Sequence, residues 1–161
     1  MNDTPQPTAF RDAFATASER LAGLIARARS EVRLYAYDLD GRLYAAEPVL
    51  EATRAFLLRG PTSHFAVLIR DESRLRFEGN RLVDLLKRLP SRAAVRVPRP
   101  EDTDLKEDLV VVDGRTYYYP LRRDPPAEPV ESRRDATVLA KRLAEAWDFA
   151  EPSVEFRHFT V

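Results

Sequence analysis

Apolar residues recur along the first half of the chain with two alternating periods, which predict the order of its elements. From Phe10 to Ala28 they recur every three or four residues and share one face of a helix. Residues 31–39 then alternate between apolar and polar, which predicts a strand that ends in the turn DLDG. A second helix is expected to begin at Pro48, with Gly60 as its left-handed cap.

The pattern of strand and helix then repeats. HFAVLIRD, residues 64–71, is almost continuously apolar, as in a strand that is covered on both faces. Residues 80–89 predict a third helix that stops at Pro90, and AAVRVP, residues 93–98, predicts a third strand. This order predicts an α/β fold whose sheet is mixed but largely parallel, with helices on both faces.

The second half of the chain predicts a hairpin, a loop, a helix and a strand. LVVVDGRTYYYP, residues 109–120, holds two strand-forming runs with a tight turn at Asp113 and Gly114. A proline-rich surface loop at 124–134 precedes an amphipathic helix, and residues 154–161 alternate like a terminal strand. We expect residues 1–9 to be a flexible lead and residues 10–161 to form a single domain.

Composition excludes several classes of function. Lysine plus arginine and aspartate plus glutamate number 26 each in the 161 residues, so no overall field attracts nucleic acid or an anionic membrane. Cysteine is absent, and His64 and His158 lie too far apart to suggest a metal site, so we expect no metal and no cofactor. No apolar run is long enough to span a bilayer and the first residues do not resemble a signal peptide, which predicts a cytoplasmic protein without a membrane partner.

This order of elements, with a hairpin that ends in VVVDG, resembles one half of a phospholipase D-like domain over nearly the whole chain. The resemblance implies a histidine nucleophile, a lysine and an aspartate on the hairpin strand. When Asp113 is matched to that aspartate, the histidine position falls on Lys106 and the lysine position on Asp108. A protonated lysine is a poor nucleophile and an aspartate repels phosphate, so the resemblance implies a degenerate domain without catalytic residues.

Three segments resemble a bacterial family of such domains more closely. They are YAYDLDGRLY, GNRLVDLLKRLPSRAAVRVP and EAWDFAEPSVEFRHFTV. That family occurs alone or beside an acetyltransferase domain, and its catalytic motif is degenerate. Asn80 departs from it, because a histidine commonly precedes the arginine that is matched here by Arg81. The resemblance implies an acetyltransferase as one candidate partner.

Ligands of open parallel sheets bind beyond the carboxyl ends of the strands, and several polar residues are expected there. We call this predicted region the remnant cleft. Its candidate residues are Asp38, Asp40, Arg70, Asp71, Asn80, Arg81, Lys106, Asp108 and Asp113. One hypothesis is an anion pocket formed by Arg70 and Arg81. The favoured one is an internal network in which these arginines pair with Asp38 or Asp40.

We interpret the chain as a non-catalytic module that binds, regulates or scaffolds a partner. One alternative is a residual phosphodiesterase or nuclease that pairs two half-sites across a homodimer. Another is nucleic-acid binding through a basic face, which acidic neighbours dilute. The candidate basic residues are Arg74, Arg76, Arg81, Lys87, Arg88 and Arg92.

Overall fold

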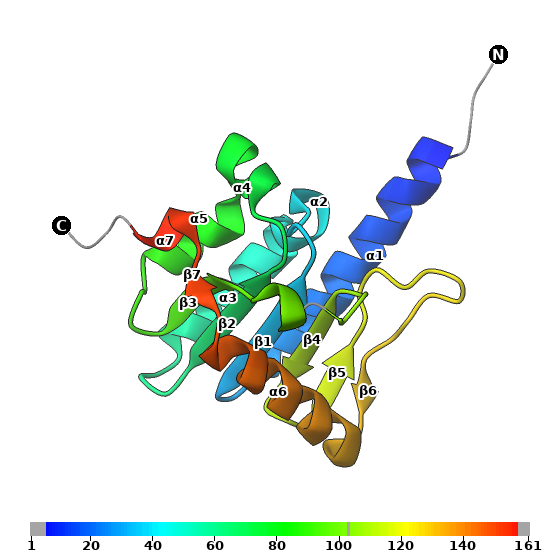
Figure 1. Ribbon diagram of the computed structural model, residues 1–161. Coiled ribbons are helices and arrows are strands. Elements are labelled where there is room, and N and C mark those ends of the chain that lie inside the picture. Colours follow the sequence, from blue (N-terminus) through cyan, green and yellow to red (C-terminus); the bar gives the residue numbers. More distant parts are fainter. Residues whose placement is uncertain (1–5, 103, 158–161) are drawn as a thin grey trace.

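A seven-stranded mixed sheet forms the centre of the protein, in the strand order β6-β5-β4-β1-β2-β3-β7 (Figure 1). The computed structural model describes residues 6–102 and 104–157, with side chains for 13–102 and 104–156. Strands β1, β2 and β3 are parallel, and β4 and β7 lie antiparallel beside them. The strands are β1 (Glu31–Ala36), β2 (His64–Ile69), β3 (Ala93–Val97), β4 (Leu109–Val112), β5 (Thr116–Tyr118), β6 (Val130–Glu131) and β7 (Glu151–Pro152).

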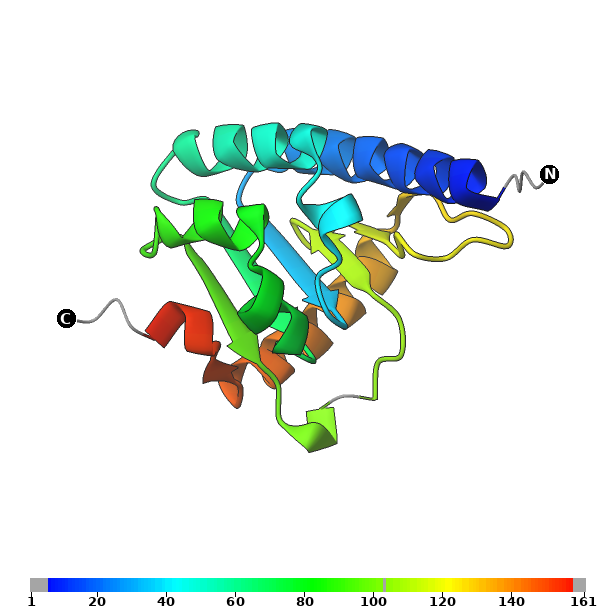
Figure 2. The ribbon, with the colours of Figure 1, turned by 90° about the horizontal axis from the view of Figure 1, so that it is seen from above.

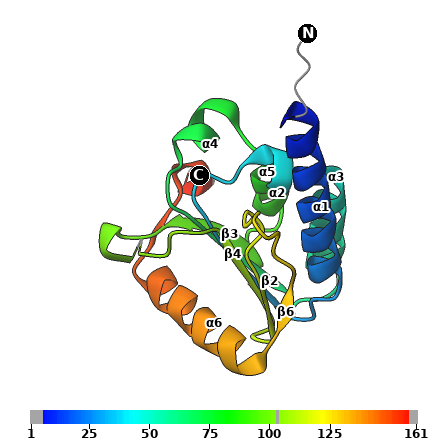
Figure 3. The ribbon, with the colours of Figure 1, turned by 90° about the vertical axis from the view of Figure 1, so that its right-hand side faces the viewer.

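Helices cover both faces of this sheet, as predicted. Helix α6 packs on one face, while α1, α3 and α5 cover the other (Figure 3). The helices are α1 (Gln6–Ala26), α2 (Gly41–Tyr44), α3 (Glu47–Leu58), α4 (Ser73–Glu78), α5 (Arg81–Lys87), α6 (Arg133–Asp148) and α7 (Val154–Arg157), with a short 3-10 turn at Pro100–Asp102. None of the helices in the described part of the chain combines the length and apolar character needed to cross a membrane.

The two faces of the sheet bury two separate clusters, because side chains alternate along each strand. In β1, Val32 and Leu34 point toward the core under α1 and α3, while Tyr35 joins the cluster under α6. In β2, Val67 and Leu68 divide in the same way. The apolar run of residues 64–71 is therefore explained by burial on both sides, which confirms that prediction.

Several local predictions are wrong. The loop expected after β2 contains helix α4, and the proline-rich loop contains the two-residue strand β6. Gly60 is not a left-handed cap, because α3 ends at Leu58 with the right-handed Arg59 as its C-cap, and Gly60 is not among the glycines with positive φ. Helix α4 and strand β6 are short, so few apolar residues distinguish them from loops.

The chain ends also differ from the prediction. Helix α1 begins at Gln6, so residues 6–9 extend the helix instead of belonging to a flexible lead. Strand β7 lies at Glu151–Pro152, and residues 154–157, expected to be extended, form helix α7. The rest of the predicted terminal strand, including His158, lies outside the described residues. Ser153 explains the change, because its hydroxyl accepts from the amide of Glu155 where the chain turns into α7.

Parallel pairing brings the carboxyl ends of β1, β2 and β3 to one edge of the sheet. Strand β5 also ends there, since it is antiparallel to β4 and β4 is antiparallel to β1. We call this edge the carboxyl edge. The opposite edge holds the start of β1, the β4–β5 turn and His64, which begins β2.

Candidate functional site

Asp108 lies at the carboxyl edge, immediately before β4, and its side chain is buried inside the fold. Only 5% of the residue is exposed. Its Oδ1 accepts from the backbone amide of Tyr37 at 3.0 Å, just beyond the end of β1. Its Oδ2 accepts from the hydroxyl of Tyr44 in α2 at 2.6 Å. The carboxyl group therefore joins β1, α2 and β4 from within.

Burial also governs the acid–base behaviour of Asp108 and Tyr44. Burial raises the pKa of Asp108, although the hydrogen bonds from Tyr44 and Tyr37 lower it in part. The negative charges of Asp38 and Asp40 raise it further. Burial and the adjacent carboxylate likewise raise the pKa of Tyr44 well above its usual value. Asp108 is thus an acceptor that holds the fold together, and it presents no cation to a ligand.

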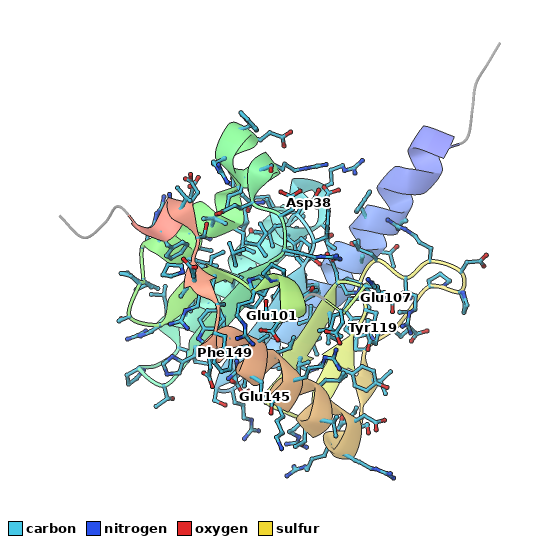
Figure 4. The ribbon with its side chains drawn as sticks, in the orientation of Figure 1. Asp38, Glu101, Glu107, Tyr119, Glu145 and Phe149 are labelled. Carbon is cyan, nitrogen blue, oxygen red and sulfur yellow. The ribbon has the colours of Figure 1, made fainter. Side chains whose placement is uncertain are left out.

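Lys106 lies two residues earlier and points outward, where it is exposed. Its neighbour Glu107 forms a bidentate ion pair with Arg122, and the guanidinium of Arg122 stacks 4.1 Å from the centre of the Tyr119 ring. Figure 4 shows Glu107 and Tyr119 next to each other beside the hairpin. The acidic neighbour of Lys106 is therefore engaged in a surface ion pair.

A pocket of about 310 Å³ opens at the carboxyl edge and contains three of the predicted cleft residues, Asp38, Asn80 and Arg81. Figure 4 places Asp38 near α2 and α4. Arg74, Glu78 and Asp84 contribute further charged side chains to the lining. The three carboxylates outnumber the two guanidiniums, so the pocket is not suited to an anion.

Asp38 and Asp40 form ion pairs, but neither pairs with Arg70 or Arg81, so the predicted network is absent from the side chains that the structure describes. Asp38 pairs with Arg74 of α4 at 3.2 Å, and Asp40 pairs with Arg42 at 2.7 Å. Hydrogen bonds from Arg42 lower the pKa of Asp40. Arg81 pairs instead with Glu47 at 2.9 Å, on the surface. The predicted pairing of Arg81 with Asp38 or Asp40 is therefore wrong, because helix α4 places Arg74 nearer.

Arg70 and Asp71 follow β2, and both contact Tyr37. The guanidinium of Arg70 is 5.6 Å from the centre of the Tyr37 ring. Asp71 accepts from the amide of Ser73 at 2.9 Å, and hydrogen bonds from the side chain and the amide of Ser73 lower the pKa of Asp71. Arg70 thus stacks on an aromatic ring and does not pair with Asp38 or Asp40, contrary to the network hypothesis.

Asp113 is not in the cleft. It lies at the opposite edge, in the β4–β5 turn, and accepts from the amides of Arg29, Ser30 and Glu31 at 2.8, 2.9 and 2.9 Å. Its φ of 54° is in the left-handed region, which aspartate tolerates better than most residues. The turn signal was correct, but Asp113 also anchors the start of β1.

Asn80 lies in the cleft and caps helix α5. Its Oδ1 accepts from the amides of Leu82 and Val83 at 2.8 and 3.3 Å, while its Nδ2 donates to the carbonyl oxygen of Leu39 at 2.9 Å. We expect Asn80→Ala to lower the free energy of unfolding by about 1–2 kcal/mol, because one cap and one tertiary hydrogen bond are lost. Urea unfolding would measure this change.

The matched control for that prediction is Asp84→Ala, an exposed position on the same helix. Asp84 lies in the first turn of α5, where an exposed acidic side chain contributes about 0.3–1 kcal/mol, so its substitution should cost less than that of Asn80. Equal effects of the two substitutions would contradict a capping role for Asn80.

Tyr44 and Arg74 are the residues of this region whose role the sequence did not indicate. Tyr44 belongs to α2, a helix of only four residues that was not predicted and that begins at the last residue of the predicted DLDG turn. Arg74 belongs to α4, which was expected to be a loop. Leu75 is the buried residue of that helix, so its apolar periodicity gives little signal. In the described part of the chain, no group of three His, Cys, Asp or Glu residues is placed to hold a metal ion.

Solved structures define the class of this fold. NucT from Helicobacter pylori superposes with a TM-score of 0.64 at 12% identity, covering 87% of this chain and 92% of that one. Nuc from Salmonella typhimurium, a phospholipase D family member, gives 0.55 at 14% identity, with coverage of 83% and 88%. The protein therefore has a phospholipase D-like α/β fold.

A third structure shares this fold within a larger chain. TrmBL2, an archaeal chromatin protein described as having a novel mode of DNA binding, gives a TM-score of 0.59 at 14% identity. The match covers 87% of this chain and 52% of TrmBL2, so it spans about half of that protein.

Residues 13–159 match the model of a domain of unknown function, DUF7931, and the chain belongs to that family. No curated protein matches the sequence.

Proposed function

We propose that this protein is a non-catalytic phospholipase D-like domain that binds, regulates or scaffolds a partner. The observation that supports this proposal best is the position of Asp108. The resemblance matches it to the catalytic lysine, yet its carboxyl group is buried and bonded to Tyr37 and Tyr44. A carboxylate there would repel a phosphoryl group, and burial keeps the side chain from reaching one.

Lys106, the residue matched to the nucleophilic histidine, supports the same proposal. Its side chain is exposed and ends in an ammonium group, which has no lone pair for attack on phosphorus. His64 is no substitute, because it begins β2 at the opposite edge of the sheet. Removal of a nucleophile costs a covalent mechanism many orders of magnitude in rate.

Assembly and location belong to the same proposal. We expect a cytoplasmic protein, and a homodimer or an acetyltransferase partner are the assemblies that the resemblance favours. Sedimentation velocity of the purified protein, alone and over a range of concentrations, would distinguish a monomer from a dimer. Identification of the proteins that co-purify at its native level would test the partner.

Two alternatives predict different results. A residual phosphodiesterase requires an activating group at Lys106 or Asp108. Nucleic-acid binding, suggested by the fold shared with TrmBL2, requires a basic surface. Here Arg74 and Arg81 pair with Asp38 and Glu47, which neutralises part of the candidate basic face. Absence of salt-dependent binding to a DNA or RNA duplex at low salt would exclude the second alternative.

We predict no hydrolysis of phosphodiesters by the purified protein. The assay uses bis(p-nitrophenyl) phosphate and a single-stranded DNA oligonucleotide, with an enzyme known to hydrolyse each substrate as the positive control. A variant in which Lys106 is changed to alanine serves as the matched control for a trace of contaminating nuclease. Activity that persists through successive purification steps and is lost in that variant would overturn the proposal.

A further inference from the structure

A second pocket lies between helix α1 and the segment that follows β5. It has a volume of about 310 Å³, and its walls come from α1 and from residues 118–127. Figure 2 shows α1 running beside the long loop that joins β5 to β6. None of its lining residues belongs to the pocket at Asp38. Its volume is within the range of small-molecule sites.

The charged side chains that line this pocket are all arginines. They are Arg20 of α1 and Arg122 and Arg123 of the loop, and none of the described lining residues is acidic. Arg122 is neutralised by Glu107. Within the side chains that the structure describes, Arg20 and Arg123 form no ion pair with a carboxylate. Two unpaired positive charges therefore face one small pocket in a chain whose total charge is balanced.

Both unpaired arginines are held in place by other contacts. Nη1 of Arg20 donates to the carbonyl oxygen of Ala127 at 2.8 Å, which ties α1 to the loop. The guanidinium of Arg123 lies 4.8 Å from the centre of the Phe14 ring. A guanidinium has five N–H donors, so these contacts leave donors for a ligand. Arginines that are already positioned lose less conformational entropy when they bind one.

Tyr118 supplies a further polar group close to these arginines. Burial raises the pKa of its hydroxyl, while the charges of Arg20 and Arg123 act in the opposite direction. Both guanidiniums are therefore near the phenol, which stays protonated at neutral pH and can donate a hydrogen bond. The remaining walls are largely apolar and include Ala17 and Pro120.

We propose that this pocket binds a small phosphate monoester whose organic part is apolar. A phosphate monoester carries a charge of about −1.5 to −2 at neutral pH, which matches the two unpaired guanidiniums, whereas a simple carboxylate would neutralise one. Arginine also binds phosphate oxygens in a bidentate geometry. The apolar walls stabilise an aromatic or aliphatic group and would contribute nothing to free phosphate. This proposal is independent of the one on catalysis, because it concerns different residues.

The test is isothermal titration calorimetry with phenyl phosphate as the probe, at low salt and neutral pH. We expect saturable binding to the full chain, and binding at least tenfold weaker in Arg20→Gln and in Arg123→Gln, since each variant loses a charge-assisted hydrogen bond. Arg54→Gln is the matched control, because Arg54 is an exposed arginine of α3 outside the pocket, and it should bind like the wild type.

Three outcomes would overturn the proposal. They are absence of binding at millimolar phenyl phosphate, equal weakening by Arg54→Gln, and inorganic phosphate that binds as tightly as phenyl phosphate. Thermal unfolding of each variant without ligand shows whether it is folded. If Arg20→Gln is unfolded because its bond to Ala127 is lost, Arg123→Gln provides the same test.

Discussion

Asp108→Ala is expected to lower the free energy of unfolding by about 3 kcal/mol, because it leaves two buried donors without an acceptor. The donors are the hydroxyl of Tyr44, which is fully buried, and the backbone amide of Tyr37. The removed side chain also leaves a cavity between α2 and the sheet. Chemical denaturation followed by circular dichroism would measure the loss.

Two further variants test whether the loss of stability is specific to Asp108 or follows from any substitution beside the hairpin. Glu107→Ala removes the neighbouring carboxylate, whose ion pair with Arg122 is on the surface, and should cost no more than about 1 kcal/mol. Tyr44→Phe removes one of the two donors to Asp108 and should cost about 1–2 kcal/mol. If Asp108→Ala is no more harmful than Glu107→Ala, Asp108 does not have the structural role that supports the proposed function.

The raised pKa of Asp108 gives this role a defined dependence on pH. A carboxyl group whose pKa is higher in the folded state than in the unfolded state favours folding while it is protonated, and this contribution is lost as pH rises through the folded pKa. Asp108→Asn cannot ionise and should accordingly gain stability relative to the wild type as pH rises over that window. A constant difference between the two proteins across the acidic range would contradict the assignment.

The sheet and its main helices were predictable because their signals extend over many residues. The alternation in residues 31–36 and the apolar run of β2 require burial on particular faces, and tertiary packing agrees with both. Helix α4 and strand β6 were missed because six and two residues carry too little periodicity. Their formation depends on contacts with distant segments, such as the pairing of Thr116 with Glu131.

The candidate site was predicted only in part, for a geometric reason. The rule that strands end at a common edge correctly brought Asp38 and Asn80 to one pocket. The same rule does not predict which arginine pairs with which carboxylate. That pairing depends on side chains such as Arg74, which belongs to the unpredicted helix α4. The clustering of arginines around Tyr118 was also not predicted, because α1 and the loop after β5 are far apart in sequence. The hydrogen bond from Arg20 to Ala127, for example, joins residues that are 107 positions apart.

Asp113→Ala should lower the free energy of unfolding by about 2 kcal/mol, although Asp113 is far from any proposed site. The variant removes the acceptor for three consecutive amides and places alanine at a positive φ. Burial acts to raise the pKa of Asp113, but the hydrogen bonds from Ser30, Arg29 and Glu31 outweigh it and the pKa is lowered. Its stabilising contribution is therefore present above the ordinary pKa of aspartate and is lost as pH falls through the folded value.

Two variants make this prediction decisive. Asp113→Asn keeps one acceptor oxygen and a residue that tolerates the left-handed region, so it should lose less stability than Asp113→Ala and should lack the dependence on pH. Glu131→Ala, which breaks only a surface pair with Arg115 at 3.5 Å near the same turn, should change little. The pKa values of Asp113 and Asp108 are shifted in opposite directions, so acid affects the two contributions to stability oppositely. On acidification, the loss in free energy of unfolding caused by Asp113→Ala should shrink. Over the same range, the wild type should gain stability relative to Asp108→Asn. Parallel pH profiles for the two positions would show that the anchoring of β1 has been assigned to the wrong carboxylate.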